Sequence, residues 1–270
     1  MYKRQVIVTA VRWYGRFRLS LRDVCDLLAE RGVDVSPRTV LSWVHTFGPL
    51  LAAELRRKAR PLGSRWYVDE TYVRVAGAWA YLYRAVDETG QVVDVLLRER
   101  RDLASARAFL QQARRRRAPG PAAVITDKHP AYGRAVRRHV PRAAHTRTGL
   151  HRTRGETTTP VERSHAPVKD RLRAMRGLRS VATGQRVLEA VEAAQAVRRG
   201  DLWRVPGRAR TGVVATDGAR ARKQALTFLF AAQDLRLSGD PPAGRAPARG
   251  AGRSAPPAGQ RPPPSRRAPR

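Results

Sequence analysis

Cysteine is almost absent from this chain of 270 residues, in which Cys25 is the only one. A single cysteine excludes an intrachain disulfide and any zinc site built from several cysteines. Long apolar runs are missing too, since none approaches the roughly 20 residues that a bilayer-spanning helix needs. The N-terminal residues do not show the layout of a signal peptide. These absences predict a cytoplasmic protein with no membrane partner.

Acidic residues are also scarce, with 22 Asp and Glu against 54 Lys and Arg, which leaves a formal net charge of +32. A chain this basic repels itself unless it meets a polyanion, and nucleic acid is the leading candidate. The apolar fraction of 42% is ordinary for a globular protein. The length allows one or two domains with a sizeable core.

The first 50 residues have the pattern of a small all-α unit. Ser20 can cap one helix, and Ser36 can cap the next, which has Pro37 at its first position. A helix, a short connection and a second capped helix are typical of a helix-turn-helix unit, whose second helix lies in the DNA major groove. An ordinary helical hairpin remains the alternative. The DNA-facing side chains expected on the second helix are Arg38, Thr39 and Ser42.

Strand patterns begin after a basic connector at residues 51–64. Three β-rich runs predict an antiparallel meander, and they span Trp66–Val75, Trp79–Asp87 and Gln91–Arg98. A helix at Leu103–Arg116 should follow, and then a short apolar strand, Ala122–Asp127, that is buried on both faces.

The remainder of the predicted catalytic domain, residues 65–200, is mostly helical. Helices are expected at Pro130–Arg138, from Pro160 with an interruption at Pro167, and at Ser180–Arg199, whereas residues 141–159 are polar and irregular. Residues 201–270 form a basic tail with one helix expected at 225–237 and disorder beyond it, because Pro, Gly, Ala and Arg dominate there.

Three carboxylates stand at element positions suited to a metal site. Asp69 lies within the first strand, Asp127 ends the isolated strand, and Glu162 lies in the first turn of the helix that starts at Pro160. Acidic groups that converge from such elements can hold two Mg²⁺ ions, because hard cations take oxygen ligands. The plainer alternative is that Asp69 ends a strand or pairs with an arginine. Glu70 should point to the opposite sheet face and is interpreted as structural.

Three sequence blocks resemble the DDE transposases of the insertion-sequence-6 family of bacterial mobile elements. The blocks are Asp69-Glu70-Thr71-Tyr72, Thr126-Asp127 with Pro130-Ala131-Tyr132, and Glu162 with His165 and Lys169. The resemblance implies an RNase H-like catalytic domain, an α/β fold with a mixed sheet flanked by helices, preceded by the helix-turn-helix unit.

The same resemblance implies the roles of individual residues. Asp69, Asp127 and Glu162 would be the catalytic triad that binds two Mg²⁺ ions, with Mn²⁺ as a substitute. Lys169 would act near the cleaved bond, and the DNA contacts expected along the same helix are His165, Lys169 and Arg173.

The function expected from these observations is metal-dependent cleavage of insertion-sequence ends and strand transfer into target DNA. The partners would be terminal inverted repeats, target DNA and further copies of the chain, as a homodimer or higher oligomer, at the bacterial nucleoid. Two alternatives stay open: an RNase H-like nuclease without strand transfer, and a non-catalytic helix-turn-helix regulator.

Overall fold

The computed structural model describes residues 2–117, 119–148, 159–175 and 177–201. The expected tail after Asp201, including the helix at 225–237, lies outside these ranges. Within them, every helix is too short or too polar to cross a membrane.

Three helices open the chain: α1 (Arg4–Arg16), α2 (Leu21–Ala29) and α3 (Pro37–Lys58). The predicted caps are confirmed, since Ser20 accepts a hydrogen bond from the Asp23 N–H and Ser36 accepts one from the Thr39 N–H, each at 3.1 Å. Helix α3 passes residue 50 without a break, and α1 and α3 both pack against α7 (Val181–Arg199). The division into units at residues 50 and 64 stays a prediction.

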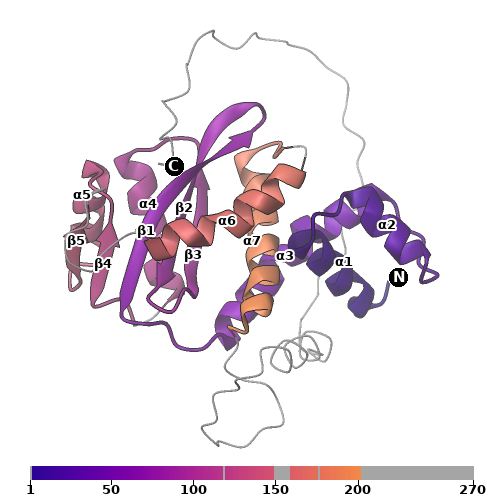
Figure 1. The fold of residues 1–270 in the computed structure, drawn as a ribbon, viewed down its shortest axis with the longest axis horizontal. Coiled ribbons are helices and arrows are strands. Elements are labelled where there is room, and N and C mark those ends of the chain that lie inside the picture. Colours follow the sequence, from indigo (N-terminus) through magenta and orange to yellow (C-terminus); the bar gives the residue numbers. More distant parts are fainter. Residues whose placement is uncertain (1, 118, 149–158, 176, 202–270) are drawn as a thin grey trace, which may run out of the picture. The chain divides into compact units, whose positions relative to one another are not determined.

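A five-stranded mixed sheet forms the centre of the fold, in the order β3-β2-β1-β4-β5. The predicted meander is confirmed, because β1 (Arg65–Val75), β2 (Ala78–Asp87) and β3 (Val92–Arg98) pair antiparallel. Strands β4 (Ala123–Thr126) and β5 (Ala144–Arg147) extend the sheet in parallel on the other side of β1. Figure 1 shows β4 and β5 beside the long β1–β2 hairpin.

Strand β5 corrects the expectation that residues 141–159 are irregular throughout. Its sequence, Ala-His-Thr-Arg, has no apolar alternation, and none of its four residues is buried. The strand is held by backbone pairing with β4, which runs from Ala123↔Ala144 to Thr126↔Arg147. An edge strand of this kind leaves little signal in the sequence because pairing, rather than burial, defines it.

Helices cover both faces of the sheet. Trp66, Tyr83 and Ala85 pack in one core with α4 (Leu103–Arg116) and α5 (Pro130–His139). Because side chains alternate along a strand, Arg84 points to the opposite face, where it bonds to residues of α6 and α7. The mixed sheet flanked by helices, with this strand order, is the RNase H-like arrangement that was expected.

Helix α6 (Thr159–Ala174) corrects a second expectation, since it continues through Pro167 without interruption. A proline inside a helix removes one backbone hydrogen bond, and tertiary contacts can compensate for that loss. Here Val161, His165 and Val168 are buried on one side of the helix, and α6 packs against β1 and β2. One continuous helix therefore carries all the functional positions predicted from Glu162 to Arg173.

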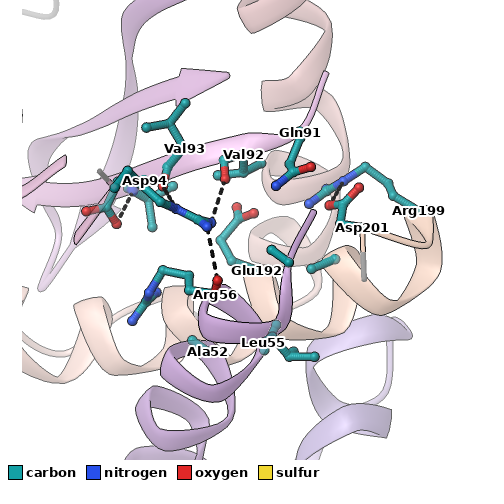
Figure 2. A pocket seen from close by; sticks show the side chains of 15 residues that line it. Ala52, Leu55, Arg56, Gln91, Val92, Val93, Asp94, Glu192, Arg199 and Asp201 are labelled. Atoms are coloured by element: carbon teal, nitrogen blue, oxygen red, sulfur yellow. Dashed lines mark hydrogen bonds and ion pairs between the residues drawn. The ribbon is translucent and has the colours of Figure 1, made fainter. Parts of the chain in front are cut away.

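A half-buried arginine, Arg117, joins α3 to the sheet. Figure 2 shows the pocket where α3, β3 and α7 meet, with Arg56, Val92 and Val93 among its lining residues. The Arg117 guanidinium donates to the carbonyl oxygens of Val93, Arg56 and Val92 at 3.1, 3.2 and 3.2 Å. Burial, reinforced by the charge of Arg56, lowers the pKa of Arg117 to about 10. The hydrogen bonds in this pocket therefore hold the end of α3 against β3.

Candidate active site

Strand pairing brings Asp69 and Asp127 together. Strands β1 and β4 run parallel, and their last paired residues are Val68 and Thr126. Asp69 is the next residue of β1, and Asp127 directly follows the last residue of β4, so both carboxylates stand where β4 ends. One ligand oxygen from each of Asp69, Glu70 and Asp127 lies within 4.8 Å of the other two. The structure thus assembles two of the three predicted acids, together with Glu70.

Glu70 faces the α5 side of the sheet. The Tyr132 hydroxyl donates a hydrogen bond to Glu70, Arg101 forms an ion pair with it, and the Glu70 side chain is only 4% exposed. Burial raises the pKa of Glu70 to about 6, although the hydrogen bond from Tyr132 and the charge of Arg101 act against this rise. These contacts fit the structural role expected for Glu70. Its place in the acid cluster was not anticipated.

Arg101 is the functional neighbour that the sequence did not reveal. Its Nη2 donates to Asp127 Oδ2 at 2.9 Å, while the same guanidinium pairs with Glu70. The other oxygen of Asp127 accepts the backbone N–H of His129 at 2.9 Å. Arg101 offsets the repulsion between neighbouring carboxylates, and these bonds fix the orientation of Asp127. In the sequence Arg101 is one of many arginines, so nothing marks it out.

Helix α6 approaches the acids from the other face of the sheet. His165 is 5% exposed, and its Nε2 lies 3.6 Å from Asp69 Oδ2. Neither ring nitrogen has a hydrogen-bond partner among the described residues. Glu162 lies one turn earlier on α6, is exposed, and is not a member of the cluster formed by Asp69, Glu70 and Asp127. The structure therefore places Glu162 on the helix that reaches Asp69.

A hydrogen bond from β2 holds the start of α6 in place. Arg84 pairs with Asp69 in the antiparallel register of β1 and β2, so both side chains point to the α6 side. Arg84 Nε donates to Ser164 Oγ at 2.8 Å, and Ser164 Oγ donates to the Val161 carbonyl at 2.6 Å. The turn that contains Glu162 is thus tied to the strand that pairs with Asp69.

The predicted DNA-contacting residues lie on two separate helices. On α3, Arg38 and Ser42 are exposed, while Thr39 is half-buried and shares a hydrogen bond with Ser36. On α6, Lys169 and Arg173 line two adjoining surface clefts. These placements are compatible with DNA contact, and the role of each residue stays a prediction. The burial of His165 places it beside Asp69 rather than on an open surface.

Comparison with known proteins identifies the family. A family model described as a DDE domain matches residues 63–201. The transposase for insertion sequence-like element IS431mec of Staphylococcus aureus (strain Mu50 / ATCC 700699) is 34% identical over 191 residues, which cover 71% of this chain and 83% of that protein. This chain belongs to the DDE transposases of the insertion-sequence-6 family.

Other similar proteins agree with this family. The transposase for insertion sequence element IS257 in transposon Tn4003 of Staphylococcus aureus is 33% identical to this transposase, over 71% of this chain and 83% of that protein. The likeness to solved structures is looser. The magnesium-bound catalytic core of HTLV-2 integrase shares 18% identity, with a TM-score of 0.36 over 52% of this chain and 89% of that chain. The catalytic domain of Mos1 mariner transposase shares 13%, with a TM-score of 0.34 over 61% and 90%.

Family membership decides between the functions that the sequence left open. The protein is a DNA transposase, and its enzymatic class is that of the DDE transposases, which use divalent metal. Neither a simple nuclease nor a regulator without an active domain is therefore needed to account for the chain.

Proposed function

We propose that Asp69, Asp127 and Glu162 hold two Mg²⁺ ions, with Mn²⁺ as a substitute, for cleavage and strand transfer. The observation that carries the proposal is the meeting of Asp69 and Asp127 where β4 ends, with their oxygens within 4.8 Å of each other and of Glu70. A set of carboxylate oxygens suits hard divalent cations. When bound, such ions lower the barrier to attack on a phosphodiester by stabilising the attacking and leaving oxygens.

The residues around the acids have distinct tasks in this proposal. Arg101 neutralises and orients Asp127 from the α5 side, and His165 supports Asp69 from the α6 side. Lys169 and Arg173 bind phosphates of the DNA strand beside the scissile bond. Water attacks a phosphodiester at the element end, and the freed 3′-hydroxyl then attacks target DNA. No serine or tyrosine nucleophile is required.

The helix-turn-helix residues supply recognition. The exposed start of α3 suits contact with base edges in the major groove, and we assign Arg38, Thr39 and Ser42 to the terminal inverted repeats. The two ends of the insertion sequence must be brought together, so a homodimer or higher homo-oligomer on DNA is the expected assembly. The working location would be the bacterial cytoplasm, at the nucleoid.

A joining assay with labelled element ends and plasmid DNA tests the proposal. Wild-type protein should join ends to plasmid only when divalent metal is present, and Asp127→Asn should lose joining while it retains DNA binding. The matched control is Asp26→Asn, which removes an exposed carboxylate on α2 outside the acid cluster. Unchanged joining in Asp127→Asn would defeat the metal assignment. Nicking without joining by wild-type protein would defeat the strand-transfer part of the proposal, and binding without either reaction would defeat both parts.

A further inference from the structure

A cleft of about 970 Å³ lies between the tip of the β1–β2 hairpin and the C-terminal part of α6. The hairpin tip turns tightly at Ala76 and Gly77, whose φ angles are 49° and 82°. The Ala76 N–H donates to the Leu178 carbonyl at 2.7 Å, and Val75 pairs with Leu178. These backbone bonds fix the hairpin tip to the segment that follows α6, so both walls of the cleft are held in place.

Two exposed aromatic side chains form the hairpin wall of this cleft. Tyr72 is 39% exposed and Trp79 is 42% exposed, although most large apolar side chains in the described residues are buried. Their ring centroids lie 6.1 Å apart in an edge-to-face arrangement, and Tyr81 lies 5.1 Å from Tyr72. Aromatic rings that remain exposed beside a cleft provide a stacking surface for a planar ligand.

The same cleft is strongly basic. The Arg74 guanidinium lies 4.7 Å from the centre of the Trp79 ring. Its described lining residues include four cations and no acid; the cations are Arg74, Lys169, Arg173 and Arg179. A second cleft shares Lys169 and Arg173 and adds Arg16, Arg18, Arg171 and Arg198, with Asp170 as its one acid among the described lining residues. This part of α6 is therefore a basic ridge between two clefts, which suits a phosphate backbone.

We propose that the cleft binds an unpaired nucleotide of the DNA, with its base against Trp79 and Tyr72 and its flanking phosphates on Lys169 and Arg173. A duplex buries its base faces in its own stack, whereas an unpaired base can stack on an aromatic side chain. Because stacking depends little on the identity of the base, the cleft should select an unpaired base and not a particular sequence.

The position of the cleft along α6 predicts where the unpaired nucleotide lies. Lys169 and Arg173 follow Glu162 on the same helix, at about 10 and 17 Å along its axis for a rise of 1.5 Å per residue. At about 3.4 Å per nucleotide step, these distances correspond to roughly three to five steps. This register rests on the proposed function, because it requires the cleaved bond to lie at the acids. Binding of the unpaired base in the cleft does not rest on the proposed function.

Fluorescent duplexes test the proposal with the full chain in EDTA. Each duplex carries one unpaired 2-aminopurine at a successive position from its end, and fully paired duplexes serve as the reference. Wild-type protein should bind the unpaired series more tightly, with the strongest stacking signal roughly three to five steps from the end. Trp79→Ala should lose this preference by about tenfold, with affinity for paired duplex unchanged. Trp79→Phe should retain most of the preference because it preserves an aromatic face.

Two control variants separate stacking on Trp79 from a general loss of aromatic surface or of positive charge. Phe17→Ala removes an aromatic side chain of similar exposure, 44%, that lies outside the cleft, and it should leave the preference intact. Lys169→Gln should weaken binding to paired and unpaired duplexes alike, because it removes a phosphate contact. An unchanged preference in Trp79→Ala would overturn the proposal. A Trp79→Ala variant that keeps the preference but no longer self-associates without DNA would also overturn the proposal. That result would show that the cleft is a contact between copies of this chain.

Failure of this proposal and failure of the metal assignment are distinguishable. The binding measurements contain no divalent metal, so they do not depend on which acids bind it. Retained joining in Asp127→Asn would remove the metal assignment without altering the preference for unpaired bases. A Trp79→Ala variant that keeps the preference for unpaired bases would overturn the cleft proposal. The joining result of Asp127→Asn would be unaffected.

Discussion

Arg84 on β2 and Glu192 on α7 form a buried ion pair, in which the side chains are 1% and 9% exposed. Arg84 also donates to Ser164 at the start of α6 and lies opposite Asp69 in the β1–β2 register. One guanidinium therefore links the strand pair that carries Asp69 to both helices on that face. We infer that Arg84 positions α6, and hence Glu162, relative to the acids.

Loss of Arg84 should destabilise the fold strongly. Arg84→Met leaves Glu192 buried without its partner, and breaking a buried pair in this way costs about 3–5 kcal/mol of unfolding free energy. The double variant Arg84→Met with Glu192→Leu should recover much of that loss, because no uncompensated charge remains. Urea unfolding followed by circular dichroism measures both. Equal stabilities of the single and double variants would show that the unpaired Glu192 carboxylate carries no such penalty.

Glu162→Gln should abolish strand joining without weakening DNA binding. The amide keeps the shape of the side chain but lacks the charge that offsets a divalent cation. We expect a loss larger than the roughly 10–100-fold that follows from changing an outer partner of a metal site. Joining assays, with binding measured in parallel by fluorescence anisotropy, test this. Glu99→Gln is an exposed control, and activity near wild type in Glu162→Gln would remove Glu162 from the triad.

A side chain at Gly48 should disturb the packing of α3 on α7. A Cβ atom there would lie 2.6 Å from the Ala190 Cβ and 3.2 Å from the Arg186 carbonyl oxygen. Gly48→Ala should therefore destabilise the protein by about 1–3 kcal/mol through overpacking. Gly133→Ala on α5 is the matched control, since nothing lies within 4 Å of its Cβ position. That control should be neutral or stabilise by up to about 1 kcal/mol, because alanine is the better helix former. Thermal unfolding of the two variants decides the matter.

Arg38→Gln should weaken binding to the terminal inverted repeat. If Arg38 contacts a base edge, the loss is about 1–3 kcal/mol and falls mainly on the repeat, with less effect on unrelated duplex. If it contacts phosphate, affinity for all sequences falls together and the salt dependence becomes shallower. Anisotropy titrations at several salt concentrations distinguish these results. Arg22→Gln, an exposed change on α2, controls for general loss of charge, and no effect in Arg38→Gln would exclude α3 from recognition at this position.

Much of the fold could be predicted because its signals are local. Ser36 and Pro37 mark a helix start, and the β-branched and aromatic residues around Asp69 mark a strand, so α3 and β1 begin within a residue of their expected positions. Strand β5 could not be predicted in this way, because its existence depends on the exposed edge of β4. The continuity of α6 through Pro167 likewise depends on packing against the sheet.

The sequence by itself determined the order of the three predicted acids along the chain and the elements that carry them, since helix and strand positions follow from local pattern. Only the tertiary structure decided which groups meet. The parallel register of β1 and β4 brings Asp127 to Asp69, and folding of a distant loop brings Arg101 between Glu70 and Asp127. Contacts of this kind depend on pairing and burial across long separations in the chain, which no local pattern encodes.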